Sequence, residues 1–177
     1  MGIQIGAKPD SGFDDPIGML KDCHRRIEHF LKIICIVVER ARTRSLSHEE
    51  KAAVEAALHY FRVGGQRHTA DEEDSLFPRM RANAALTNLR ELGHLESEHR
   101  EANQLHEDVD ALYSFWIGKG RLSAEDEEKL TSATQRLQSL YAEHIRIEES
   151  VVFPRATESL DSNTIAAIGA EFRARRA

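Results

Sequence analysis

Apolar residues recur at steps of three and four along four long stretches of the chain, which is the spacing of one face of an α-helix. These stretches predict helices over about 15–42, 47–82, 87–117 and 123–157, and a shorter one predicts a helix over about 162–173. Only a few residues separate one helix from the next, and short links favour antiparallel neighbours. The pattern therefore predicts an all-α fold, an up-down-up-down four-helix bundle with a short C-terminal fifth helix.

Capping residues and helix breakers support these boundaries. An aspartate precedes Pro16, a residue favoured at the first helical position, and residues 47–50 have the Ser-x-x-Glu pattern of a capping box. Two adjacent glycines, at 64–65, are expected to bend the second helix. Phe-Pro pairs at 77–78 and 153–154 are expected to end or kink the second and fourth helices, because proline lacks the donor for an α-helical hydrogen bond.

The length of 177 residues corresponds to one domain. We expect a flexible N-terminal segment over 1–14, the four-helix bundle over 15–157, and a C-terminal helix with a basic tail over 158–177. The arginines of the tail are expected to be solvated; they are Arg173, Arg175 and Arg176.

The net charge and the cysteines indicate which partners are disfavoured and which cellular compartment is expected. The formal net charge of −6 opposes a general affinity for nucleic acid or anionic membranes. No apolar run is long enough to span a bilayer, and the N-terminus lacks the apolar core of a secretion signal. Cys23 and Cys35 are 12 positions apart on one predicted helix, about 18 Å, which is too far for a disulfide. Reduced thiols fit the cytosol, so we expect a cytoplasmic protein; its protein partners are not specified by the sequence.

Polar residues interrupt the apolar face of every long helix. Each face carries a histidine, and two faces also carry a glutamate one turn after it. A carboxylate is almost never fully buried unless it is paired or bound to a metal. The interrupting residues are His24, His68, Glu72, His99, His144 and Glu148.

An internal repeat relates the two halves of the chain. Residues 68–79 (HTADEEDSLFPR) and 144–155 (HIRIEESVVFPR) are identical at the His, both Glu and the Phe-Pro-Arg, and a His-Arg pair occurs at both 24–25 and 99–100. The predicted helices place all six interrupting residues in the same half of the bundle. The His-x-x-x-Glu spacing puts both side chains on one helix face, and imidazole with carboxylate is a donor set for iron that also suits zinc and manganese.

The order H…HxxxE…H…HxxxE, with Glu-Glu and Phe-Pro after each paired motif, resembles the hemerythrin-like (HHE cation-binding) family over about 15–157. The resemblance implies a four-helix bundle that holds two iron ions, bridged by an oxo or hydroxo group and two carboxylates. It implies that His24 and His68 bind one iron and that His99 and His144 bind the other. It assigns the two bridging carboxylates to Glu72 and Glu148.

One departure from the family pattern bears on function. The oxygen-carrying hemerythrins have a second histidine one turn from the ligand on the third helix, whereas the positions around His99 are Leu95 and Asn103. The resemblance then leaves an open position on each iron. Open positions suit peroxide or nitric oxide chemistry better than reversible oxygen carriage.

Other polar residues near the six have two readings each. His106 and Tyr141 lie on the apolar faces and are either packing residues or neighbours of the metal site. Glu28 follows His24 by four positions but lies off the apolar face, which favours a surface carboxylate. Glu73 and Glu149 either accept a histidine N–H or face water.

The sequence thus predicts a non-haem di-iron protein that binds or turns over dioxygen, peroxide or nitric oxide, with peroxide consumption as the most concrete activity. Its expected partner is a small diatomic or peroxide ligand. The alternative is a module that senses iron or oxygen, or stores iron, without turnover. A metal-free helical adaptor, in which the polar cluster only sets the register of the bundle, is the third hypothesis.

Overall fold

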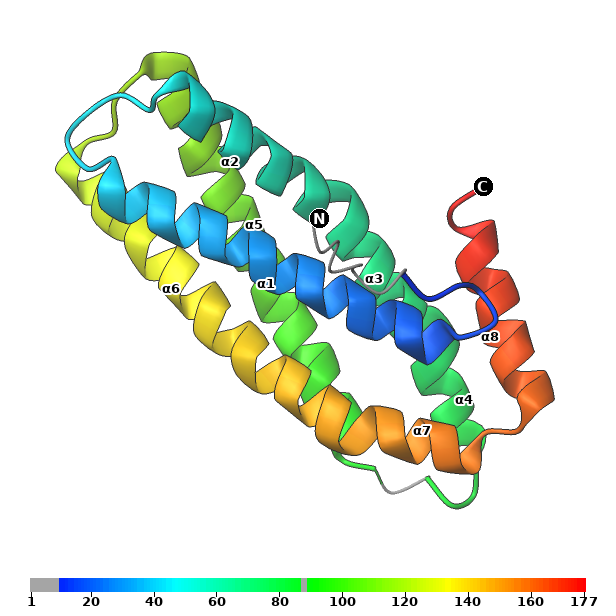
Figure 1. Ribbon diagram of the computed structural model, residues 1–177. Helices are drawn as coiled ribbons and strands as arrows, with labels where there is room; N and C mark the ends of the chain where they lie inside the picture. Colours follow the sequence, from blue (N-terminus) through cyan, green and yellow to red (C-terminus); the bar gives the residue numbers. More distant parts are fainter. Residues whose placement is uncertain (1–9, 87–88) are drawn as a thin grey trace, which may run out of the picture.

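The computed structural model describes residues 10–86 and 89–177, and all regular secondary structure within them is helical (Figure 1). The first long helix is α1, and the third is α5. The second and fourth each consist of α-helical pieces joined by π-helical turns (η). In chain order the elements are α1 (Pro16–Arg40), α2 (His48–Tyr60), η1 (Phe61–Gly65), α3 (Gln66–Asp71), η2 (Glu72–Leu76), α4 (Phe77–Ala82), α5 (Glu91–Lys119), α6 (Ala124–Ile147), η3 (Glu148–Val152), α7 (Phe153–Ser159) and α8 (Ser162–Ala174).

The predicted helix boundaries are confirmed to within a few residues, and the predicted caps account for them. The Asp15 carboxylate accepts a hydrogen bond from the backbone N–H of Gly18, and Ser47 forms a complete capping box with the third helical residue. Gly120 ends α5 in the left-handed conformation, with φ of 81°. The predicted start of this helix, at residue 87, lies outside the described residues.

The four long helices form a closed set of neighbours. α6 packs against both α1 and α5, and α2 packs against the same two helices, which is consistent with a helical bundle (Figure 1). Within the described ranges, no helix combines the length and the apolar character needed to cross a lipid bilayer.

Two apolar clusters fill the bundle, and a polar layer lies between them. On α1, Leu20 belongs to one cluster and Ile27 to the other, with His24 between them. On α5, Leu95 and Ala102 flank the polar layer in the same way. The layer is therefore enclosed by apolar side chains at both ends of the bundle.

The paired motifs coincide with two of the π-turns. The backbone N–H of Phe77 donates to the carbonyl of Glu72, and that of Phe153 donates to the carbonyl of Glu148, both five residues back. The following Pro78 and Pro154 have no N–H to give, and each proline ring would clash with the carbonyl four residues earlier. The turn before each proline widens instead, and the helix continues as α4 or α7, so of the two expected effects of the prolines the structure shows a local distortion and not an end of the helix.

The C-terminal tail differs from the sequence prediction. Arg175 and Arg176 are not solvated ends, because both pair with Asp71 of α3, at 2.8 Å and 2.5 Å. The Asp71 side chain is only 1% exposed, and the arginines are 23% and 21% exposed. A carboxylate buried this deeply requires a cation, and α8 supplies two.

The predicted flexible segment over 1–14 falls mostly on residues 1–9, which lie outside the described residues. Within the described part, Phe13 packs on α8. Its carbonyl oxygen occupies the position that a Cβ at Gly169 would need, and the Arg173 guanidinium lies 4.9 Å from its ring centroid. A side chain at position 169 is thus incompatible with this contact.

Candidate metal centre

Six side chains from all four long helices meet in the polar layer. α1, α3, α5 and α6 each contribute one histidine, and each of the two π-turns, η2 and η3, begins with one of the glutamates. All six are buried, with at most 4% exposure. They are the six residues that interrupt the apolar faces in the sequence: His24, His68, Glu72, His99, His144 and Glu148.

Glu72 contacts a histidine from each half of the chain. Its Oε1 lies 3.4 Å from Nε2 of His68, which is on the same long helix. Its Oε2 lies 3.3 Å from Nε2 of His99, on α5. The two carboxylate oxygens of one residue therefore face two different imidazoles.

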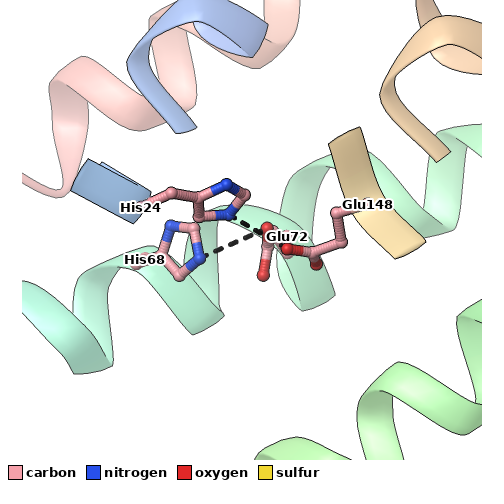
Figure 2. A group of neighbouring side chains, drawn as sticks. All are labelled: His24, His68, Glu72 and Glu148. Atoms are coloured by element: carbon pink, nitrogen blue, oxygen red, sulfur yellow. Dashed lines mark ion pairs between the residues drawn. The ribbon is translucent and has the colours of Figure 1, made fainter. Parts of the chain in front are cut away.

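Glu148 repeats this arrangement in the opposite direction. Its Oε1 lies 3.1 Å from Nε2 of His144 on its own long helix, and its Oε2 lies 3.0 Å from Nε2 of His24 on α1. Figure 2 shows both glutamates on one side of the two histidines of the first half, with their carboxylates facing the imidazoles. The internal repeat thus produces two crossing carboxylates, where crossing means that each contacts one histidine of its own half of the chain and one of the other half.

The ligand atoms separate into two overlapping groups. His24 and His68 form one group with the two glutamates, and His99 and His144 form the other with the same two glutamates. Within each group, the described side chains offer four ligand atoms that all lie within 4.8 Å of one another. Each group is suited to one metal ion, and the shared carboxylates would bridge the two.

The hydrogen bonding of the buried polar atoms shows whether this layer suits a metal cation. Seven buried side-chain atoms in the described residues form no hydrogen bond of normal geometry, although histidine nitrogens lie 3.0–3.4 Å from the glutamate oxygens, and all seven atoms belong to four of these six residues. They include both oxygens of each glutamate and Nε2 of His24 and His68. A buried polar atom without a partner costs about 1–3 kcal/mol. Converging lone pairs of this number suit metal ions, and the donor set fits iron, manganese or zinc.

The family model of the hemerythrin HHE cation binding domain matches residues 15–156. The chain belongs to this family. The resemblance inferred from the motif order is confirmed, and so is a role in cation binding. A search of curated proteins gives no significant match.

The electrostatics of the hemerythrin HHE site favour a cation. Burial and the neighbouring carboxylate of Glu148 raise the pKa of Glu72 well above its usual range. Burial acts on Glu148 in the same way, but His144 and His24 outweigh it and hold the pKa of Glu148 well below its usual range. Two adjacent buried carboxylates resist joint ionisation, and metal ions between them would remove that resistance.

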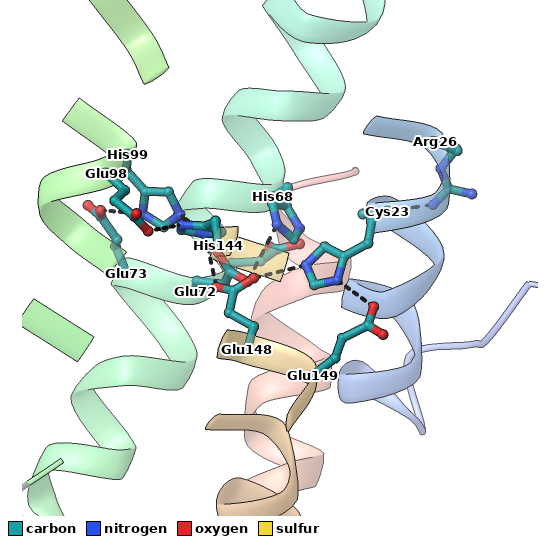
Figure 3. Close-up of polar contacts among 12 residues, drawn as sticks. Cys23, Arg26, His68, Glu72, Glu73, Glu98, His99, His144, Glu148 and Glu149 are labelled. Atoms are coloured by element: carbon teal, nitrogen blue, oxygen red, sulfur yellow. Dashed lines mark hydrogen bonds and ion pairs between the residues drawn. The ribbon is translucent and has the colours of Figure 1, made fainter. Parts of the chain in front are cut away.

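Three further carboxylates orient the histidines from outside the site (Figure 3). Nδ1 of His24 lies 2.8 Å from Glu149, and Nδ1 of His99 lies 2.7 Å from Glu73. Of the two readings of Glu73 and Glu149, the structure thus supports the one in which each accepts a histidine N–H. A carboxylate at Nδ1 leaves the Nε2 lone pair free to bind a metal and makes it more basic.

The third outer carboxylate, Glu98, was not anticipated from the sequence. Its Oε2 lies 3.0 Å from Nδ1 of His144. Burial lowers the pKa of His144, but Glu148 and the hydrogen bond with Glu98 outweigh this and raise it to about 9. In the sequence, Glu98 directly precedes the predicted ligand His99. This position does not indicate a contact with His144, because adjacent residues on a helix point about 100° apart and His144 lies on another helix.

Two phenylalanines cover the site. The Phe153 ring stacks on His24 with centroids 5.4 Å apart and planes 13° apart, and the Phe77 ring lies nearly parallel to His99 at 6.4 Å. The Phe-Pro pairs therefore have a second effect besides the π-turn, because they place an apolar wall against one imidazole of each half.

The remaining candidates lie outside the two ligand groups. The Glu28 side chain is 51% exposed and pairs with Arg25, as the surface reading predicts. Asn103 is exposed. His106 and Tyr141 form a hydrogen-bonded pair, Nε2 to Oη at 3.2 Å, and burial lowers the pKa of His106 to about 4.

A cleft of about 620 Å³ leads from the surface to this pair. It lies between the second long helix and α5, and its lining includes Gly65, Glu73, His106 and Tyr141. The Tyr141 ring lies 6.1 Å from that of His144, and Glu73 holds His99. The inner end of the cleft is thus adjacent to the metal centre.

Proposed function

We propose that the protein is a non-haem di-iron protein that binds or turns over a small ligand such as dioxygen, peroxide or nitric oxide. The observation that carries this proposal is the crossing of Glu72 and Glu148, each of which contacts one histidine from each half. A single ion does not require two carboxylates that both span two histidine pairs. We also propose the up-down-up-down order of the helices, which their short connections support.

His24 and His68 would hold one ion and His99 and His144 the other, with Glu72 and Glu148 shared between them. When bound, two iron ions would supply Lewis acidity and one-electron redox chemistry toward a small ligand. Two imidazoles and two carboxylate oxygens are four protein donors for each ion, fewer than the six that octahedral coordination uses. Each ion would therefore keep room for a ligand.

The third helix supplies no further imidazole. Leu95 is fully buried in the apolar cluster at one end of the site, and Asn103 is exposed. This composition supports turnover rather than the reversible oxygen carriage associated with an additional histidine. The apolar clusters on both sides keep bulk water out, and the cleft ending at Tyr141 offers a path of suitable size for a small ligand.

The compartment we propose is the cytosol. Both cysteines are free and buried, which supports a reducing environment. A small ligand that crosses membranes would reach the protein there without a dedicated partner.

The deciding experiment combines metal analysis with a peroxide assay. We expect two irons per chain after purification in air, near-ultraviolet charge-transfer absorption, and peroxide consumption that chelation abolishes. Glu148→Gln should lose metal and activity, because it removes one shared carboxylate. His59→Ala, at an exposed histidine of α2, is the matched control and should keep both.

The outcomes separate the hypotheses. Two bound irons without peroxide or nitric oxide turnover would assign the protein to iron or oxygen sensing, or to iron storage. A protein that binds no metal, and in which Glu148→Gln changes nothing, would refute the di-iron proposal in favour of a structural polar cluster.

A further inference from the structure

The two halves of the metal centre differ at one histidine. Three of the four histidines have a carboxylate at Nδ1, namely Glu149, Glu73 and Glu98. The fourth, His68, is 2% exposed, and neither of its ring nitrogens has a hydrogen-bond partner among the described residues. Water cannot replace these missing hydrogen bonds, because the His68 side chain has almost no exposed surface.

The internal repeat identifies the residue that should have filled this role. Glu73 and Glu149 each follow a crossing glutamate, and each supports a histidine of the opposite half. Glu98 directly precedes the histidine of α5 and supports the histidine of α6. By the same relation, the residue that precedes the histidine of α1 should support His68, and that residue is Cys23.

Cys23 does not replace the carboxylate. Its side chain is buried, and its sulfur accepts a weak contact from Nη2 of Arg26 at 3.5 Å (Figure 3). A thiol is a poor hydrogen-bond acceptor compared with a carboxylate and carries no negative charge when protonated. The carboxylate present in the second half is therefore missing from the first.

We infer that the two metal positions are unequal: the His99–His144 position binds its ion tightly, and the His24–His68 position binds a second, exchangeable ion. This inference rests on the proposed function. Removal of an outer partner from a metal-bound histidine weakens metal affinity about 10–100-fold. We expect the two positions to differ by about this factor. The difference assigns exchange of the ion to the half that contains Cys23.

The test isolates each position in turn with a redox-inert probe, Zn²⁺, titrated into metal-free protein in competition with a chromophoric chelator. His68→Ala disables the first position and leaves the second, and His144→Ala does the reverse. We expect the site that remains in His68→Ala to bind Zn²⁺ about 10–100-fold more tightly than the site that remains in His144→Ala.

Substitution of Cys23 or Glu98 should then change the Zn²⁺ affinity of one position only. In the His144→Ala background, Cys23→Glu should strengthen Zn²⁺ binding, and Cys23→Asn offers a neutral acceptor if the buried charge prevents folding. In the His68→Ala background, Glu98→Gln should weaken binding. Cys35→Ser, at the other buried cysteine of α1, is the control and should change neither affinity.

Several results would overturn the inference. Equal affinities in the two single-site variants would show that the missing carboxylate has no consequence. Failure of both Cys23→Glu and Cys23→Asn to strengthen the weaker site in folded protein would show that its weakness has another cause. Absence of Zn²⁺ binding in the wild type would instead refute the metal centre itself, so the two failures are distinguishable.

Discussion

Replacement of Arg175 and Arg176 by alanine should destabilise the bundle strongly, although both residues lie at the end of the chain. The double variant leaves the Asp71 carboxylate, whose side chain is 1% exposed, without either cation. Removal of one side of a buried ion pair costs about 3–5 kcal/mol, because the remaining charge stays desolvated. The arginines are themselves 23% and 21% exposed, so water can enter where they were, and we expect about 3 kcal/mol.

Thermal and urea unfolding of metal-free protein measure this loss without a contribution from metal binding. For a chain of this length, about 3 kcal/mol corresponds to a decrease of about 6–12 °C in Tm. Adding Asp71→Asn to the double variant should restore part of the stability, because a neutral amide needs no counter-charge. Arg173→Ala is the control: this arginine lies over the Phe13 ring, and its loss should cost less than about 1 kcal/mol.

Two results would refute this reasoning. A double variant within about 1 kcal/mol of the wild type would mean that the pairs have the small value of surface salt bridges. A loss that Asp71→Asn does not reduce would mean that the arginines act through packing of their side-chain stems, and not through the buried charge.

The remaining predictions concern the metal, the glycine pair and pH. Chelation should lower Tm in calorimetry, because an ion at 100 times its Kd contributes about 2.7 kcal/mol; identical melting with and without metal would argue against the site. Gly65→Ala should raise stability by about 0.5–1 kcal/mol, whereas Gly64→Ala should lower it, because its Cβ would lie 2.7 Å from the Tyr60 ring; urea unfolding of both gives the signs, and equal effects would contradict the contact. Hydrogen bonds from Arg44 and a backbone amide lower the pKa of Glu50 to about 2, so the stability that Glu50 adds is complete above pH 4.5 and is lost as pH falls toward 2. The difference in unfolding free energy between wild type and Glu50→Gln should shrink over this interval, and a constant difference would show that the charge of Glu50 is not involved.

Local pattern was sufficient for the helices and for the members of the cluster. A period of 3.6 residues and the capping residues define helix ends from neighbouring positions alone. A histidine and a glutamate on an otherwise apolar face are also local signals, and the repeat of 68–79 at 144–155 added a second occurrence. The structure confirms that these residues meet, and their role as metal ligands stays a prediction.

Contacts between distant residues were decided only by the tertiary structure. Asp71 belongs to the run Asp-Glu-Glu-Asp, in which the sequence does not distinguish a carboxylate paired with the tail from a ligand or a solvated charge. Its partner Arg175 is 104 positions away, and Glu98 is 46 positions from the histidine that it supports. Helical periodicity specifies which face a residue occupies, but not which residue of another helix lies opposite at the same height. That register depends on how the apolar side chains of all four helices pack, and it determines which histidines Glu72 and Glu148 contact.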